Sequence, residues 1–468
     1  MNKKFILSIV TATLLASTNV YADTEVVDYA TSADLDELQE LVDTIETKTL
    51  TDRIKWSGDL RLRNDNFTYK KGPTDTANTQ TGTGSDTTRD THSFDKKWDP
   101  HYSVRLRLNM STDITDDVKF TGRMVIQHDT QNNERICILS ENITASGSQA
   151  NTAFDIDKAY IDYKVTGYDS KLPVIYSMGI LPTTGGLSSN IAEGTSRKSV
   201  FPSLMFDTNL YGGIVSADLS KVTGIKDFWI RGVAGKAFTL NSGLYYYQCN
   251  RETIQNEDVM GLFAESNFSM LGDNNTLYVG VSSIANIKAT PYLGSSSAAF
   301  SIKTAKPMGD IINIGTGVEV RNINNSGLTV FGHFSYSKPD GNGIAMNFDT
   351  FSSGGYASGE MLSKDGHAYY VGGRYDMDKL ALGAEFNHGS KYWWSATQGS
   401  EDVFNKLAVR GDVIELYATY GFTDTFTAKL GYYRAQENFT GSGWHFGEPA
   451  VKNNAIQENI YVTLDAKF

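Results

Sequence analysis

The sequence predicts an all-β fold: a transmembrane, antiparallel, up-and-down β-barrel of about 16 strands, with a short periplasmic helix before it. Three observations predict this fold. Apolar and polar residues alternate with period two from Ile54 onward, the connections alternate between short and long, and the last strand ends on Phe468. Such strands, with short turns at one end and long loops at the other, are typical of outer-membrane barrels. Residues 54–468 are therefore the predicted transmembrane β-barrel.

The amino-terminal residues have the pattern of an export signal. Two lysines precede an apolar stretch from Phe5 to Leu15, and Val20-Tyr21-Ala22 resembles a cleavage site. The apolar stretch is too short for a transmembrane helix, which needs about 20 residues. We therefore expect residues 1–22 to be a signal peptide and residues 23–53 to be a periplasmic segment.

Residues 32–49 are the predicted helix, because Leu35, Leu38, Val42 and Ile45 recur at the spacing of a short heptad seam. About fifteen residues hold an isolated helix poorly, so we expect this helix to need a partner. Two interpretations are open. The helix is either a periplasmic coiled coil or plug at the barrel mouth, or an amphipathic helix that lies against the periplasmic rim of the barrel.

Period-two alternation begins with the first predicted strand. Trp56, Leu60 and Leu62 share one face of it, and Arg61 and Arg63 share the other. The later strands repeat this pattern, so each has an apolar face for lipid and a polar face for the lumen. They are predicted at residues 102–110, 118–127, 154–165, 172–181, 208–219, 227–238, 257–270, 275–286, 310–321, 327–338, 367–376, 379–390, 412–421, 424–435 and 457–468.

The connections between these strands give a check on the strand count. They change from long at residues 67–100 to short at residues 112–117, and the alternation continues along the chain. Residues 298–306 resemble one further strand, but counting them would place the long 339–366 connection on the side of the short turns. Leaving them in an outer loop preserves the alternation and gives about 16 strands, with about 14 or 18 as the alternatives.

Composition and motifs exclude several classes of function. The formal net charge of −12 argues against a nucleic-acid partner. The histidines and cysteines lack the spacing of a zinc site, and neither a P-loop nor a G-x-S-x-G motif is present. We therefore expect no metal, no cofactor and no catalytic residue. Cys137 and Cys249 permit a single disulfide in an exported chain, and the sequence leaves open whether it forms.

Three sequence blocks carry a resemblance to known proteins. The opening IKWSGDLRLRND at residues 54–65, just after the heptad helix, resembles the start of porin-like bacterial outer-membrane β-barrel proteins. DKAYIDY at residues 157–163 and the glycine-rich block at residues 179–213 are similar to one uncharacterised family of this type. The resemblance covers roughly the whole mature chain. It implies a barrel and a pore, and it implies no particular solute.

Charged residues on the lumen parity divide into two walls, because the first four strands carry mainly bases and the later strands mainly acids. Like charges stacked in a wall need water or counter-ions, so a basic wall favours a hydrated lumen. The alternative is that the walls neutralise each other in salt bridges and leave no selective path. The predicted pore-lining residues are Lys55, Arg61, Arg63, Arg105, Arg107, Lys119, Arg123, Lys158 and Lys164 on the basic wall, and Glu265, Glu319, Glu385 and Glu415 on the acidic wall.

The connection at residues 182–207 joins the fifth and sixth predicted strands. The porin resemblance implies that a loop at this place folds inward and narrows the pore. The connection carries Glu193, Arg197, Lys198 and Asp207, whose charges suit a constriction. The alternative is an ordinary surface loop.

We therefore expect an outer-membrane porin of a Gram-negative bacterium, a water-filled channel for passive diffusion of small polar or charged solutes. One alternative is a non-conducting outer-membrane barrel that acts in surface interaction or adhesion through its long outer loops. Another is a soluble secreted β protein. The expected partners are outer-membrane lipid and lipopolysaccharide, the small solutes, further copies of the chain in a homotrimer, and the barrel-assembly machinery, for which Phe468 is the predicted signal.

Overall fold

The computed structural model divides into two units, residues 1–54 and residues 55–468, and each is described by itself. The residues that the structure describes are 38–40, 42, 53–72, 74–78, 86–90, 94–97, 100–129, 152–181, 185–197, 199, 201–207, 210–237, 257–272, 274–289, 306–342, 345–346, 356–357, 364–397, 405–439 and 452–468.

In the first unit, residues 38–40 and 42 are helical, and Leu38 and Val42 are exposed. The remainder of the predicted helix and the predicted signal peptide lie outside the described residues. Among the residues that are described, no helix is long and apolar enough to cross a membrane.

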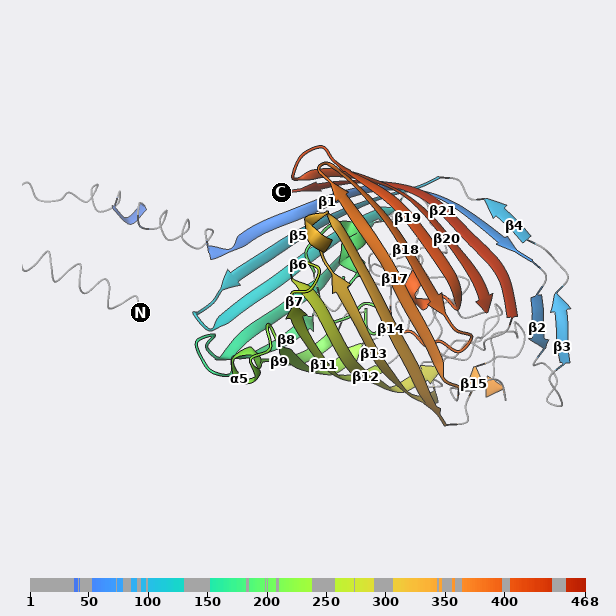
Figure 1. Cartoon of the computed structure of the whole chain (residues 1–468), viewed down its shortest axis with the longest axis horizontal. Coiled ribbons are helices and arrows are strands. Elements are labelled where there is room, and N and C mark those ends of the chain that lie inside the picture. The colour runs from blue at the N-terminus through green and yellow to red at the C-terminus, as the bar shows by residue number, and fades with distance from the viewer. Residues whose placement is uncertain are drawn as a thin grey trace, which may run out of the picture. The chain divides into compact units, whose positions relative to one another are not determined.

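The second unit is a closed antiparallel β-barrel, which confirms the predicted fold class (Figure 1). The main sheet has 17 strands, but β4 and β5 pair with successive parts of β1, so the wall is 16 strands around. The wall strands are β1 (Lys55–Lys71), β4 (Phe94–Lys97), β5 (His101–Asp113), β6 (Val118–Asp129), β7 (Thr152–Thr166), β8 (Val174–Leu181), β9 (Leu210–Asp218), β10 (Trp229–Ala237), β11 (Glu257–Phe268), β12 (Asn275–Ala289), β13 (Lys306–Val320), β14 (Leu328–Gly341), β17 (Gly366–Met377), β18 (Leu380–Gly389), β19 (Gly411–Gly421), β20 (Phe426–Phe439) and β21 (Lys452–Lys467).

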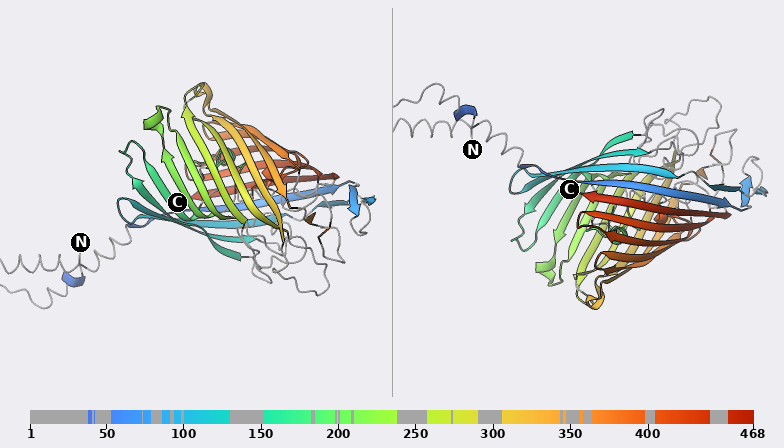
Figure 2. Two further views of the ribbon diagram at one scale, coloured as in Figure 1. Left: turned by 90° about the horizontal axis from the view of Figure 1, so that it is seen from below. Right: turned by 90° about the horizontal axis from the view of Figure 1, so that it is seen from above.

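Each wall strand pairs with its neighbours along the chain, and β1 closes the barrel by pairing with β21 from Asp59↔Lys467 to Lys71↔Ala455. Figure 2 shows from two sides that the strands form a continuous wall. Two small hairpins form separate two-stranded sheets, β2 (Thr74–Asn78) with β3 (Asp86–Asp90) and β15 (Ala345–Met346) with β16 (Tyr356–Ala357).

Two predicted boundaries at the barrel seam are wrong. The long connection was predicted to begin at residue 67, but β1 continues to Lys71, and β21 begins at Lys452, five residues before the prediction. The extensions pair with each other at Lys70↔Ile456 and Lys71↔Ala455, and the outward positions of β1 there, Thr68 and Lys70, are polar. The sequence pattern that indicates a strand is an alternation of apolar and polar residues. This pattern stops where the outward face becomes polar, although the main-chain pairing of the strand continues beyond that point.

Short connections gather at one end of the barrel, where the short helix α5 (Ser220–Thr223) joins β9 to β10 (Figure 1). The wall alternates as predicted. In β11 the outward Met260 and Leu262 are 64% and 54% exposed, whereas the inward Val259 and Phe263 are buried. The outer surface of the wall is therefore apolar, and the core of the protein is inside the barrel.

That core is made by two segments which fold into the barrel. The first inward segment, residues 185–197, 199 and 201–207, lies between β8 and β9 and contains α4 (Ser189–Glu193). The second inward segment, residues 390–397 and 405–410, lies between β18 and β19 and contains the 3-10 helix η3 (Lys406–Ala408). They meet where the amide of Asp207 donates to the carbonyl of Ala396 at 3.0 Å.

Candidate functional site

The first inward segment is built from apolar residues that a surface loop would leave exposed. Phe201, Leu204 and Phe206 are fully buried. A Cβ added to Gly186 would lie 1.7 Å from the main-chain oxygen of Phe201, so the two arms of the segment approach too closely for a side chain there. The predicted inward fold of this connection is thus specified by a glycine and by apolar residues.

These residues pack on inward side chains of the wall. Ile191 and Leu204 share a cluster with Phe331 of β14 and Tyr370 of β17. The ring centroids of Phe201 and of Phe263 in β11 are 4.5 Å apart. Aromatic contacts of this kind hold the segment against the wall over β11 to β17.

Glu193 ties the same segment to another part of the wall. Its carboxylate pairs with the guanidinium of Arg61 in β1, and it accepts from Nζ of Lys429 in β20 at 3.2 Å. Arg61 also donates through Nε to Asp465 at 2.6 Å. The carboxylate of Glu193 therefore links the first inward segment to the strands that close the barrel.

Glu265 forms a second tie. Its two oxygens accept from Nη1 and Nη2 of Arg197 at 2.8 and 2.9 Å, and Arg231 of β10 donates to it at 2.9 Å. A bidentate guanidinium–carboxylate pair fixes direction as well as distance. The ion pairs of Glu193 and Arg197 therefore hold the segment between its buried apolar residues Ile191 and Phe201.

A buried polar cluster makes the third tie. Ser188 donates to Oε1 of Glu319 at 2.9 Å and is hydrogen-bonded to Nε2 of His333, whose Nδ1 is hydrogen-bonded to the hydroxyl of Tyr278. Arg321 pairs with the other oxygen of Glu319 at 2.6 Å. All but Arg321 are buried, so the cluster holds the segment and is closed to solutes.

Lys406 anchors the second inward segment to the wall. Nζ of Lys406 pairs with Glu385 of β18 and with Glu415 of β19, the latter at 2.5 Å. Tyr370 donates to Glu385 at 2.8 Å, and Tyr461 donates to Glu415. Two of the four predicted acids of the acidic wall therefore hold a segment inside the barrel.

The predicted basic wall is interleaved with acids. Arg61 lies directly opposite Arg105 in the register of β1 and β5, but Arg105 pairs with Asp59 at 3.2 Å and Arg63 pairs with Asp65 at 2.8 Å. These ion pairs lie within the basic wall, among residues of β1 and β5. Whether the two walls neutralise each other stays a prediction.

Arg123 pairs with Asp157, which the sequence pattern did not place inside. A β-bulge between β6 and β7 shifts the register at Arg123/Met124 and leaves Asp157 as the extra residue on its strand. Bulges change strand parity without a distinct composition, so no sequence signal pointed to this acid.

The other predicted bases lie apart from one another. Lys55 is exposed at the first residue of β1, Lys158 is half-buried, and Arg107 is buried. Lys119 and Lys164 line a cavity. That these residues, with the four acids, line an open pore stays a prediction.

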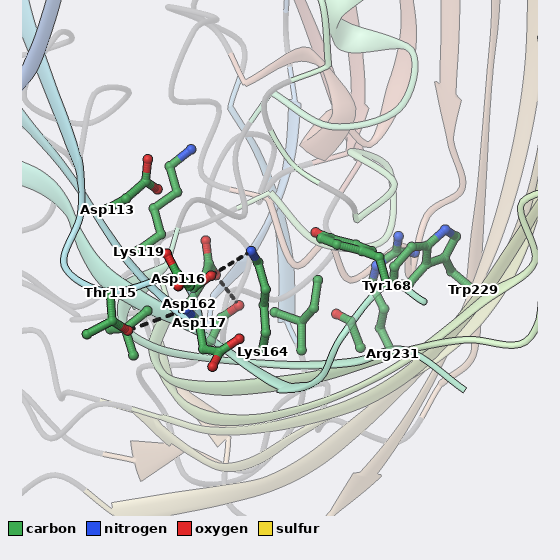
Figure 3. A pocket seen from close by; sticks show the side chains of 14 residues that line it. Asp113, Thr115, Asp116, Asp117, Lys119, Asp162, Lys164, Tyr168, Trp229 and Arg231 are labelled. Carbon is green, nitrogen blue, oxygen red and sulfur yellow. Dashed lines mark hydrogen bonds between the residues drawn. The ribbon is translucent and has the colours of Figure 1, made fainter. Parts of the chain in front are cut away.

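This cavity of about 470 Å³ lies inside the barrel at the end of the short turns (Figure 3). Its lining combines carboxylates, two ammonium groups and two large aromatic rings. The lining residues are Asp113, Thr115, Asp116, Asp117, Val118, Lys119, Asp162, Lys164, Tyr168, Ile175, Ser177, Ser216, Trp229 and Arg231. Arg231 connects it to the first inward segment through Glu265.

A second cavity of about 60 Å³ lies between the two inward segments and the seam strands. Arg61, Glu193, Lys406 and Tyr461 contribute to it. Its lining is charged and its size suits water. This second cavity lies beside the ion pairs of Glu193.

Some predictions lie outside the described residues: Lys198 and the disulfide between Cys137 and Cys249. Asp207 is buried in the contact between the inward segments and accepts from the amide of Gly185 at 3.3 Å. In the part of the chain that the structure describes, His, Cys, Asp and Glu side chains form no group that would hold a metal ion. Sequence reasoning missed the roles of Ser188, His333 and Lys406, because these depend on contacts between distant segments.

A family model described as "Protein of unknown function (DUF3373)" matches residues 95–466. No curated protein matches the chain.

Three solved structures are among those similar to this chain. OmpF of Salmonella typhi, in complex with daunomycin, is 11% identical with a TM-score of 0.45, over 89% of this chain and 97% of that one. OprB of Pseudomonas putida, at high pH, is 13% identical with a TM-score of 0.47, over 90% and 96%. OmpT, an outer membrane protein of Vibrio cholerae folded in vitro, is 12% identical with a TM-score of 0.41, over 89% and 97%.

Proposed function

We propose that this chain, which belongs to the DUF3373 family of proteins of unknown function, is an outer-membrane channel with a lumen narrowed by its own inward segments. The observation that carries this proposal is the first inward segment, which is tied to the wall at Glu193, Arg197 and Ser188. A loop that is fixed inside a wide barrel by charge pairs narrows the lumen without needing to seal it.

The proposed location is the outer membrane of a Gram-negative bacterium. A closed barrel leaves no unpaired strand edge, which is what a sheet needs in order to lie in lipid. Trp56, Tyr163 and Phe426 are exposed on the outward face at the end of the short turns, as expected for an aromatic girdle at a membrane interface. Short turns face the periplasm in such barrels, so the cavity of about 470 Å³ would open there.

The solutes would be small and polar or charged. Sixteen-stranded barrels are wide enough to leave an aqueous channel. Here the inward segments occupy part of that width, and the charged pairs at Glu193 and Glu265 border what remains. A solute that passes must exchange hydration for contacts with these groups, which favours polar solutes over apolar ones.

A planar-bilayer recording tests the proposal. The refolded full-length protein should give stepwise current increments, and the reversal potential in asymmetric salt should report the ion preference. The folded state is checked separately by the shift in electrophoretic mobility between unheated and heated samples. A protein that is folded by this measure and never conducts would overturn the channel proposal.

A second candidate function has its own observation. Lys406, placed between Glu385 and Glu415, fixes a second segment inside the barrel and packs it on the first. Two inward segments in contact also suit a closed barrel that acts through its outer loops. The same recording distinguishes the candidates, because only the channel conducts.

The remaining partners are proposals as well. Outer-membrane lipid and lipopolysaccharide would contact the exposed apolar wall, and the barrel-assembly machinery would bind the last strand with Phe468. A homotrimer is the proposed assembly, and cross-linking in native membranes followed by denaturing electrophoresis tests it. A single monomeric species after cross-linking would contradict the trimer.

A further inference from the structure

We infer that the cavity at the short-turn end of the barrel is a binding subsite for a zwitterionic solute of the amino-acid or short-peptide class with an apolar side chain. The inference rests on the proposed function for the route by which the solute arrives. The subsite is formed by carboxylates on one side, an ammonium group in the middle and two aromatic rings (Figure 3).

The carboxylates come from the last residue of β5 and from the turn that joins β5 to β6. Asp113, Asp116 and Asp117 are exposed and line the cavity. Within the described part of the chain, none of them has an ion-pair partner. Asp162 on the adjoining wall is already engaged by the hydroxyl of Ser177, which donates to it at 2.5 Å. Three carboxylates in one short turn would bind the ammonium group of a solute.

Two ammonium groups stand beside these acids. Lys164 donates to the main-chain oxygen of Asp116 at 2.9 Å, which uses one of its three N–H donors. Lys119 of β6 lies opposite Asp113 of β5 on one side and opposite Asp162 of β7 on the other. No ion pair forms among these three residues. A solute carboxylate would therefore find ammonium donors within the same cavity.

Aromatic rings complete the lining. Tyr168 is 56% exposed, with Nζ of Lys164 5.5 Å from the ring centroid. Trp229 has the guanidinium carbon of Arg231 at 5.3 Å from its ring centroid. Each cation contacts one face of its ring and holds the ring in place, and a flat or apolar side chain would pack on the remaining surface.

The combination selects for a class of solute. A simple cation would be attracted by the three aspartates and repelled by the lysines. A simple anion would be attracted by the lysines and repelled by the aspartates. A solute with both charges satisfies both sets of groups, and an apolar side chain satisfies the rings. The cavity volume of about 470 Å³ lies within the ~300–1,000 Å³ range of small-molecule sites, so such a solute fits.

Isothermal titration of the full-length protein, refolded in detergent, tests the inference with phenylalanine as the probe. Phenethylamine carries only the ammonium group, 3-phenylpropionate carries only the carboxylate, and glucose is a neutral polar control. Phenylalanine should bind, and each one-charge analogue should bind at least about tenfold more weakly, which corresponds to about 1.4 kcal/mol. Equal affinity for phenylalanine and either analogue, or no binding of phenylalanine, would overturn the inference.

Variants place the binding in the cavity. The double change Asp116→Asn and Asp117→Asn should weaken phenylalanine binding about tenfold. The matched control is Asp169→Asn, an exposed aspartate in the adjoining turn that does not line the cavity. An equal loss in the control, or no loss in the double variant, would contradict this location.

Failure of this inference is distinguishable from failure of the channel proposal. Binding in detergent needs no conduction, and conduction in salt needs no bound solute. A conducting barrel that does not bind phenylalanine overturns the subsite alone. A barrel that binds phenylalanine and never conducts overturns the channel and leaves the subsite.

Discussion

Gly58 and Phe468 close the barrel against each other. The amide of Gly58 donates to the carbonyl of Phe468 at 2.7 Å, and the amide of Phe468 donates back to the carbonyl of Gly58 at 3.0 Å. A Cβ added to Gly58 would lie 2.4 Å from Cζ of the Phe468 ring. The terminal aromatic ring thus occupies the place of the side chain that Gly58 lacks. An aromatic ring over a strand glycine stabilises the pairing that the glycine alone would weaken.

We predict that Gly58→Val weakens closure of the barrel. The new side chain needs the space of the Phe468 ring, and such overpacking costs about 1–3 kcal/mol. The measurement is the temperature at which the electrophoretic mobility changes from the folded to the unfolded position. Gly232→Val is the matched control, because nothing lies within 4 Å of a Cβ added to Gly232. If Gly58→Val has the same transition temperature as the Gly232→Val control and the parent protein, the packing role of the Phe468 ring is contradicted.

Deleting residues 188–200 should raise single-channel conductance and relax size exclusion. The deletion removes α4 together with the ties at Ser188, Glu193 and Arg197, so the lumen widens where the segment lay. Conductance in a planar bilayer and the passage of sized neutral polymers measure the two effects. Unchanged conductance from a folded barrel would show that the segment is no constriction.

A finer test keeps the segment and removes one charge. Glu193→Gln leaves Lys429 and Arg61 without their shared carboxylate, so the end of α4 is held less firmly. We predict larger current fluctuations in the open channel, because the segment moves within the lumen. Asp378→Asn, in the exposed turn between β17 and β18, removes an equal charge away from the segment and should leave the recording unchanged. Identical current noise in both variants would contradict this role of Glu193.

Lys406→Met should destabilise the barrel strongly. It leaves Glu385 and Glu415 buried beside each other with no cation between them, and breaking a buried pair from one side costs about 3–5 kcal/mol. The triple variant that adds Glu385→Gln and Glu415→Gln should recover much of the loss, since no like charges remain. Thermal unfolding in detergent measures both. A single variant as stable as the parent would show that the lysine contributes little to anchoring the second segment.

Periodicity in the sequence predicted most of the wall and less of the interior. Strand parity predicts an inward direction for Arg61, Glu265 and Glu415, because side-chain direction follows from a period of two, and in the structure these side chains contact the inward segments. It failed at Asp157, where a bulge inserts one residue. It also ended β1 early, where the outward face becomes polar.

The sequence by itself determined the fold class and the strand order. Each strand carries its own apolar and polar faces, and each short turn joins neighbours, so local patterns are sufficient for the wall. Only the tertiary structure decided which charges meet. The partners of Glu193 in β1 and β20, and the two carboxylates around Lys406, are brought together by closure of the barrel and by the folding of loops into it. Such contacts join residues far apart in the chain, and no local period encodes them.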